Sequence, residues 1–390
     1  MNTQNNKTSL LLSYGFRPLF ILVCCQALFH IFIWQLAWNG YLRIDWNLNP
    51  SYWHAHEMIT GFAGAAIAGF LLTAVATWTG RAPVSGLPLL VLCASWVVAR
   101  SALQWPNLAA LANIFYWLFL LILMMKEVVG AENTRNYKIL LLLLVMLVLE
   151  SAFQYSVFTQ NNSTQQIILS QLWLLILIIN TIGGRIIPAF TRNWLRAHRP
   201  ELTNEQLPKN FGRVDLIATI ALIVFAAATL LFRTTSILSA LAICTSLLLF
   251  WRLIRWKGFY AFADPLVWMM HLAYAWIPVG VFILALSYEN LVPVSAGIHA
   301  LAIGTIASMI VSVASRAALG HTNRALKAHP LLTTAIVLLS VATIFRIAAA
   351  ILREELLMHG ATLFWLLGFV CFAVHYLPIL VLPAKINPPN

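Results

Sequence analysis

The sequence predicts an all-α, polytopic membrane protein that folds as a single integral membrane domain over residues 1–390. Hydrophobic residues make up 61% of the chain and charged residues only 9%, whereas a soluble domain carries about 25% charged residues. Apolar runs of about 20 residues, long enough to cross a bilayer as a helix, recur from one end of the chain to the other. These observations exclude a soluble globular protein.

Taken in order, the apolar runs predict about twelve transmembrane helices joined by short connections. They lie near residues 17–38, 53–78, 87–105, 108–130, 137–158, 165–190, 213–233, 235–254, 264–287, 294–318, 330–352 and 361–382. One sizeable loop is expected, over residues 191–212. It follows Gly183-Gly184-Arg185-Ile186-Ile187-Pro188, where the glycines and the proline predict a break that either lines a cavity or ends the helix.

The net charge of +12 follows the pattern that orients membrane proteins. With the N-terminus inside, most of the 24 Lys and Arg residues fall at inner helix ends and loops, so both termini are predicted to be cytoplasmic. Arg192, Arg196, Arg199 and Lys209 lie in the predicted loop, where anionic lipid headgroups are the ordinary partner. Membrane lipids rather than nucleic acid are therefore the expected partners of these charges.

A sequence pattern that recurs along the chain predicts three four-helix repeats. His56 stands 25 residues before Arg81, and His299 stands 25 residues before Arg324. A glycine follows each histidine by five positions. The alternative is a coincidence among leucine-rich segments. The three repeats would cover residues 13–130, 137–254 and 264–383.

The run Trp53-His54-Ala55-His56-Glu57-Met58 places two imidazoles and a carboxylate at the start of the second predicted span. Ionisable groups are costly there, which favours a functional role. In a helix, His54 and His56 lie about 200° apart and face nearly opposite sides, whereas His54 and Glu57 share a face. One helix is therefore predicted to serve two sites. The alternative is a helix end whose imidazoles are hydrated at the membrane–water interface.

His56 and His299 fall at matched depth in the outer half of the predicted membrane, on helices that run in the same direction. Imidazole nitrogen suits haem iron and copper, so these histidines are candidate axial ligands. Arg100 and Arg346 are candidate partners of haem propionates, because a guanidinium matches a carboxylate. Glu57 is a candidate for holding or passing a proton. The alternative for each histidine is a hydrogen-bonded structural role.

A second, weaker polar cluster is expected near the inner face. It contains His271, His321, Arg185 and Arg316. Glu150 lies well inside the fifth predicted span, either as a proton-relay group or as a neutral acid bonded to a neighbour.

These arguments give three sets of candidate residues. The candidate catalytic residues are Glu57 and His54. The candidate cofactor-binding residues are His56, His299, Arg100, Arg346, His271, His321, Arg185 and Arg316. The candidate metal ligands are His54, His56, His299 and His271.

Several blocks of the sequence resemble the NnrS family, and length and span count agree with it over the whole chain. The first block is the run from Trp53 to Met58 described above. The others are Gly15-Phe16-Arg17-Pro18, Ala68-Gly69-Phe70-Leu71-Leu72-Thr73-Ala74-Val75, Trp78-Thr79-Gly80-Arg81, Gly183-Gly184-Arg185 with Pro188, and Arg316-Ala317-Ala318-Leu319-Gly320-His321-Thr322.

The resemblance implies a bacterial inner-membrane protein that binds haem, here taken as haem b, and copper, and that responds to nitric oxide and nitrosative stress. Twelve helices in three units are also similar in architecture to the catalytic subunit of haem-copper oxidases. This chain lacks the histidine-rich sixth and seventh helices of those enzymes, so a second metal would need other ligands, such as His54, Glu57, His30 or His271.

The expected function is binding of nitric oxide and its reduction or detoxification, as in a nitric oxide reductase-like oxidoreductase. Reduction would need an electron donor outside the chain, either a quinol or a redox protein. Two alternatives stay open. One is a transporter linked to haem or copper. The other is a nitric oxide sensor, or a protein that protects metal centres without turnover.

Overall fold

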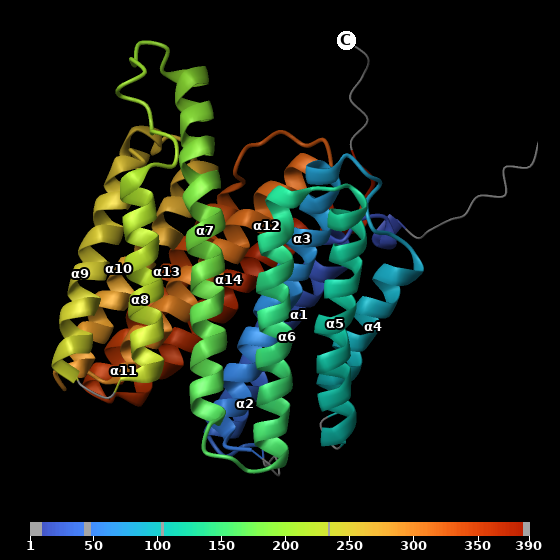
Figure 1. Cartoon of the computed structure of the whole chain (residues 1–390), viewed down its shortest axis with the longest axis vertical. Coiled ribbons are helices and arrows are strands. Elements are labelled where there is room, and N and C mark those ends of the chain that lie inside the picture. Colours follow the sequence, from blue (N-terminus) through green and yellow to red (C-terminus); the bar gives the residue numbers. More distant parts are fainter. Residues whose placement is uncertain (1–9, 43–47, 103–104, 233–234, 385–390) are drawn as a thin grey trace, which may run out of the picture. The chain divides into compact units, whose positions relative to one another are not determined.

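A computed structural model describes residues 10–42, 48–102, 105–232 and 235–384, without the side chain of Thr235 (Figure 1). Within these ranges the regular secondary structure is entirely helical, which confirms the predicted all-α class. Both chain ends, predicted to be cytoplasmic, lie outside the described residues, as do positions 103–104 and 233 of two predicted spans.

The chain forms two compact units. Unit 1 consists of Met1–Gln171, Ala317–Ala325 and Ala373–Asn390. Unit 2 consists of Leu172–Arg316 and Leu326–Phe372. This division differs from the three predicted repeats, which stay a prediction.

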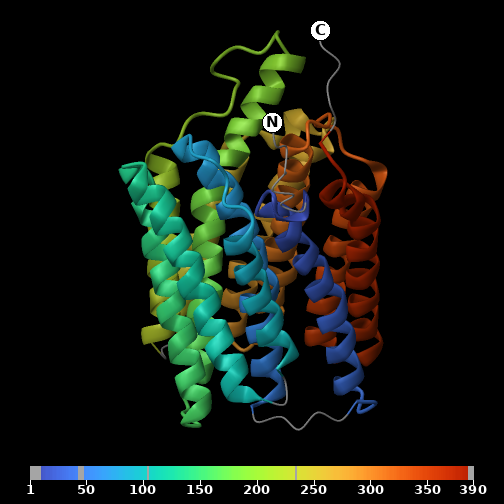
Figure 2. The same ribbon diagram turned by 90° about the vertical axis from the view of Figure 1, so that its right-hand side faces the viewer.

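Unit 1 is built from the N-terminal helices. In it α1 packs against α3, and α5 contacts both α4 and α6; Figure 2 shows α5 and α6 side by side. The bounds are η1 Leu10–Leu12, α1 Phe16–Trp38, α2 Pro50–His56, the π-helix η2 Glu57–Ala63, α3 Gly64–Thr79, α4 Leu87–Ser101, α5 Pro106–Gly130, η3 Thr134–Asn136 and α6 Tyr137–Phe158.

Unit 2 holds the later helices, in which α9 packs between α8 and α10, and α13 packs against α11 and η5. The helices α7, α12 and α14 each contribute to both units. The bounds are α7 Thr164–His198, α8 Arg213–Leu231, α9 Thr235–Arg255, η4 Gly258–Ala261, α10 Pro265–Tyr288, α11 Val294–His299, the π-helix η5 Ala300–Ala307, α12 Ser308–His321, α13 Pro330–Leu352 and α14 Glu355–Val381.

The helices have the lengths that a bilayer demands. Eleven helical segments within the described residues are long and apolar enough to cross a membrane. A further apolar helix, α4, has 15 residues and is shorter than a full span. The chain is therefore a multi-pass membrane protein, and α4 occupies the third predicted span.

Local sequence signals explain where the helix that carries His54 and His56 begins and ends. The side chain of Asn49 accepts a hydrogen bond from the backbone N–H of Ser51, and Pro50 occupies the first helical position. The helical segment then continues through η2 and α3 to Thr79. It ends there because Gly80 takes a left-handed conformation, with φ +68°, that residues with a Cβ seldom adopt.

The predicted break before residue 191 is wrong, and so is the start of the predicted loop. Helix α7 continues through Pro188 to His198. Proline removes one backbone hydrogen bond, to the carbonyl of Gly184, but it does not forbid helical dihedral angles. Gly184 has a separate reason to be glycine, because an added Cβ would lie 1.8 Å from Nη2 of Arg252.

Arg17 explains the Gly-Phe-Arg-Pro block at the start of α1. Its Nη1 donates hydrogen bonds to the carbonyl oxygens of Leu380, at 2.6 Å, and Leu382, at 2.9 Å. The carbonyl of Leu380 belongs to the last turn of α14, and Leu382 directly follows the helix, where helical partners run out. Within unit 1, a buried arginine therefore closes the last turn of a distant helix.

Two glycine-to-alanine changes test the packing of α7. Gly184→Ala should destabilise the protein by about 1–3 kcal/mol, because the new methyl group collides with Arg252. Gly320→Ala, on α12, has no heavy atom within 4 Å of the added Cβ and should be neutral or stabilising by up to about 1 kcal/mol. Free energies of unfolding in mixed micelles measure both. Equal effects of the two changes would contradict the close approach of Arg252.

Candidate functional site

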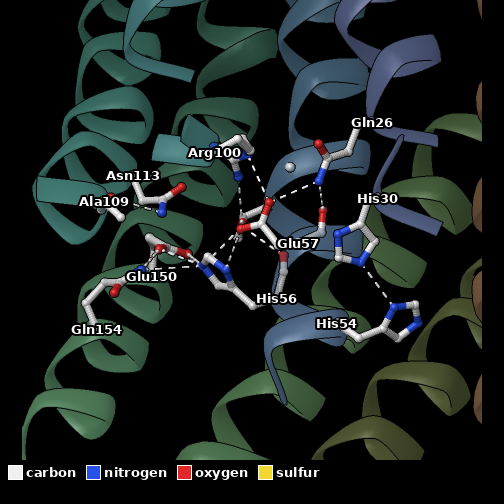
Figure 3. Close-up of polar contacts among 12 residues, drawn as sticks. Gln26, His30, His54, His56, Glu57, Arg100, Ala109, Asn113, Glu150 and Gln154 are labelled. Atoms are coloured by element: carbon white, nitrogen blue, oxygen red, sulfur yellow. Dashed lines mark hydrogen bonds and ion pairs between the residues drawn. The ribbon is translucent and has the colours of Figure 1, made fainter. Parts of the chain in front are cut away.

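A buried polar network in unit 1 centres on His56, the last residue of α2 (Figure 3). Its Nδ1 lies 3.2 Å from Oε1 of Glu57, and its Nε2 lies 3.0 Å from Oε1 of Glu150 on α6. An ionised carboxylate only accepts hydrogen bonds, so a ring nitrogen that faces one must carry the proton. The imidazole of His56 therefore bridges two carboxylates from different helices.

Glu57, the first residue of η2, is held from the opposite side by α1 and α4. Nε2 of Gln26 donates to Oε2 of Glu57 at 3.0 Å, and Nε of Arg100 lies 3.2 Å from the same oxygen. The residue is only 6% exposed. The carboxylate of Glu57 thus contacts an imidazole, an amide and a guanidinium.

Glu150 is fully buried on α6 and is surrounded by donors. Besides His56, it accepts hydrogen bonds from Nε2 of Gln154 at 2.6 Å and from Nε2 of Gln171 at 3.4 Å. The sequence left open whether Glu150 relays protons or is a structural acid. The structure places it within hydrogen-bond distance of a titratable ring, which is the geometry that a relay needs.

The four charged groups of this network balance one another. When the carboxylates of Glu57 and Glu150 are both ionised they contribute two negative charges, and Arg100 with a doubly protonated His56 contributes two positive charges. A buried charge is tolerated in a membrane interior only when it is paired and hydrogen-bonded. The network can therefore hold one proton on His56 and exchange it with either neighbouring carboxylate.

A widened helical turn positions these side chains. In the π-helix η2 the backbone departs from the α-helical pattern, and two carbonyls in or next to it accept hydrogen bonds from side chains. Nε1 of Trp96 donates to the carbonyl of Gly61 at 2.9 Å, and the hydroxyl of Tyr116 donates to that of Gly64 at 3.0 Å. Isolated π-turns occur frequently at functional sites because they re-aim side chains.

His54 contacts a different helix from His56, as the sequence predicts. Its Nδ1 lies 3.1 Å from Nε2 of His30 on α1, and Figure 3 shows this pair apart from Glu150. The ring of His54 also stacks on Trp34, with 4.6 Å between centroids, and that of His30 lies 4.5 Å from Trp53. The sequence grouped Glu57 with His54, whereas the carboxylate contacts His56.

In unit 2, His299 stands at the end of α11, directly before the π-helix η5. Its Nδ1 lies 2.8 Å from the backbone carbonyl of Ser295 and must donate a proton to it. In the neutral ring this leaves the lone pair on Nε2. Arg346 of α13 lies close enough to interact electrostatically with the ring.

His271 of α10 forms a hydrogen bond through Nε2, which lies 2.8 Å from the hydroxyl oxygen of Thr191. That hydroxyl donates its own hydrogen to the carbonyl of Ile187, so the ring nitrogen must donate to the hydroxyl oxygen. Nδ1 then carries the lone pair. An added Cβ at Gly258 would lie 2.5 Å from Nδ1, so this backbone covers the nitrogen.

The remaining residues predicted near the inner face have contacts of their own. The guanidinium of Arg316 lies over the ring of Phe190, 3.9 Å from its centroid. In unit 1, His321 stacks on Phe16 at 5.7 Å. Arg185 is exposed on α7.

The family model described as NnrS protein matches residues 10–383. The chain belongs to the NnrS family. Membership makes it a membrane protein related to the nitric oxide response. A comparison with curated proteins finds no match.

In this NnrS-family chain, sequence reasoning missed the neutral partners of the buried charges. Gln26, Gln154 and Gln171 contact Glu57 or Glu150, and each lies within an apolar helix. An amide in such a run is the signal that could have identified them, because it is costly there unless it is bonded.

A buried ion pair in unit 2 was also missed. Nε of Arg252 lies 2.9 Å from Oδ1 of Asp215, and Nη1 donates to Oδ1 of Asn180 at 2.7 Å and to the hydroxyl of Tyr274 at 3.2 Å. Arg252 is fully buried. Both ions stand near helix ends in the sequence, where a charged residue is ordinary, so only tertiary packing identifies the pair.

No group of three or more His, Cys, Asp or Glu side chains able to hold a metal ion occurs among the described residues. His56 belongs to unit 1 and His299 to unit 2. Their predicted pairing across one haem therefore stays a prediction for this family member.

The ion pair between Glu57 and Arg100 predicts a double-mutant result. Arg100→Gln should destabilise the protein by about 3–5 kcal/mol, because it removes one partner of a buried pair. Adding Glu57→Gln should recover most of that loss, because no uncompensated charge remains. Unfolding free energies of the single and double variants measure the coupling. Additive losses would show that the two groups do not interact.

Proposed function

We propose that this chain is a haem-containing membrane protein that binds nitric oxide and reduces it in the nitrosative stress response. The proposal places it in the bacterial inner membrane with both termini cytoplasmic, as its basic residues favour. Membership of the NnrS family supports the link to nitric oxide.

The observation that carries the haem assignment is the hydrogen bond of His299. A histidine that ligates a metal commonly donates its other ring proton to a backbone carbonyl or a carboxylate, which fixes the tautomer. Nδ1 of His299 is within 2.8 Å of the carbonyl of Ser295, so Nε2 presents the lone pair. This residue fits an axial ligand of haem b.

His56 fits that role less well in the arrangement described. Both of its ring nitrogens face carboxylate oxygens, at 3.2 and 3.0 Å. To ligate iron it would have to give up one of these contacts and lose a proton. We therefore propose a proton-handling role for His56, together with Glu57 and Glu150.

Haem, when bound, supplies the iron that binds nitric oxide and transfers electrons. Reduction of two nitric oxide molecules to nitrous oxide and water consumes two electrons and two protons. The substrate is small and weakly polar, so it can enter from the lipid phase. The electrons would come from an external donor, either a quinol or a redox protein.

The network in unit 1 is suited to hold and deliver protons within the membrane. Glu150, His56 and Glu57 form a continuous path of hydrogen bonds, in which every step is 3.2 Å or shorter. Arg100 stabilises the ionised form of Glu57 at one end. Proton transfer between groups held at this distance needs no movement of the backbone.

Copper, which the family resemblance suggests, would have two candidate nitrogen ligands in unit 1. Nε2 of His30 and Nδ1 of His54 face each other across 3.1 Å, and imidazole nitrogen is an acceptable copper ligand. Among the described residues, no third His, Cys, Asp or Glu side chain completes a metal-binding group with them. His30 and His54 would therefore be the copper ligands of these residue types.

Purified protein should show the Soret absorbance of haem b, and His299→Ala should lose most of it because the ligating nitrogen is gone. His198→Ala is the matched control, since His198 is exposed at the end of α7. Absorbance spectra and haem content per chain are the measurements. Absence of haem from the unaltered protein would overturn the proposal and favour a transporter.

Reduced, haem-loaded protein should consume nitric oxide, and Glu150→Gln should slow consumption by about 100-fold, the usual contribution of a positioned acid or base. Gln keeps the shape of the side chain but cannot carry the proton. Consumption followed with a nitric oxide electrode, with haem content as the control, tests this. Haem binding without consumption would identify a sensor or a protective protein instead.

A further inference from the structure

The helices that carry His56 and His299 have the same local construction. In each, a short α-helix ends at the histidine, and a π-helix begins at the next residue. The helices are α2 and η2 in unit 1, and α11 and η5 in unit 2. Position for position, Glu57 therefore corresponds to Ala300.

This exchange of glutamate for alanine changes the contacts of the histidine. In unit 1 the carboxylate of Glu57 contacts both Nδ1 of His56 and Nε of Arg100. Ala300 is fully buried at the corresponding place and offers no carboxylate. Nδ1 of His299 is instead bonded to its own helix, at the carbonyl of Ser295.

An arginine also accompanies the histidine in unit 2, but it lacks the acid. Arg346 lies on the buried face of α13, with Ala342 and Ala349 one turn before and after it, 0% and 8% exposed. Helix α13 packs against both α11, which ends at His299, and η5, which begins at the next residue. Among the described residues, Arg346 forms no ion pair, in contrast to Arg100.

Two further buried donors in unit 2 lack a protein partner within the described residues. They are the hydroxyl of Thr305, on η5, and Nε1 of Trp276, whose ring packs against Gly304 of the same helix. Buried donors are satisfied in most proteins, so orphans near one element indicate a missing acceptor. Both donors lie on or against η5, and η5 packs against α13, the helix of Arg346.

We propose that Arg346, beside His299, binds the carboxylate or a similar planar oxyanion of a ligand, in the role that Glu57 has toward Arg100 in unit 1. A half-buried arginine within a membrane-spanning helix is costly without a counter-charge. A guanidinium pairs with planar oxyanions through parallel N–H bonds, which gives the site its chemical preference.

Two sources offer this chemistry. One is a propionate of haem, and this part rests on the proposed function. The other is a small free anion such as formate or nitrite. In the first case Arg346, and not Arg100, is the propionate partner, because Glu57 already neutralises Arg100.

The first experiment uses haem-free protein in lipid nanodiscs and formate as the probe, with chloride at equal ionic strength as the reference. Formate should raise the midpoint of thermal unfolding, followed by tryptophan fluorescence, in the unaltered protein. The response should disappear in Arg346→Gln and in Ala300→Glu, which supplies an internal carboxylate. Arg353→Gln, at the exposed end of α13, is the matched control and should respond normally.

The second experiment distinguishes the two sources by titrating the haem-free protein with haem b and with its dimethyl ester. A propionate ligand predicts binding of haem b about tenfold tighter than the ester, with the difference lost in Arg346→Gln. A free anion predicts equal binding of both, with the formate response retained.

Formate stabilisation that persists in Arg346→Gln would overturn the proposal. The proposal would also be overturned if formate did not raise the unfolding midpoint and haem b did not bind more tightly than its dimethyl ester. Binding of both haem forms with equal affinity and no formate response would reject the anion site while leaving the proposed function intact. Failure to bind any haem, with a normal formate response, would reject the proposed function while leaving the anion site intact.

Discussion

The cost of placing a charge in an apolar phase governs this protein. Each ionised side chain deep in a membrane-spanning helix must find an opposite charge or several hydrogen bonds, because no water is available to solvate it. Glu57, Glu150, His56 and Arg100 meet this demand as a neutral set drawn from the N-terminal helices and α6. Asp215 and Arg252 meet it as a fully enclosed pair in unit 2.

The same constraint acts on the backbone. A helix in a membrane satisfies its own carbonyls, so a departure from the α-helical pattern requires outside donors. The indole of Trp96 bonds the carbonyl of Gly61 in η2, and the hydroxyl of Tyr116 bonds that of Gly64, which directly follows η2. At the end of α14, Arg17 has that task. Irregular backbone is thus stabilised by long side chains from neighbouring helices, and in η2 it turns Glu57 toward α1 and α4.

The two histidine helices illustrate how one construction can serve two chemistries. With a glutamate after the histidine, the ring contacts a carboxylate and its arginine is neutralised within the protein. With an alanine, the ring bonds to its own backbone, and the nearby arginine has no acidic partner among the described residues. The residue after the histidine therefore separates a ring that is bonded to carboxylates from one that is bonded to its own backbone.

The sequence by itself determined the all-α membrane class, the near-complete set of spans and the ionisable residues of the second span, because apolar length and buried charge leave direct traces in composition. It could not reveal that His56 lies against Glu150 or that Arg252 reaches Asn180, since these contacts join residues far apart in the chain. It also predicted a break at Pro188, where α7 continues. Tertiary structure decided these points because a helix presents many side chains, and only the neighbouring helices determine which of them meet.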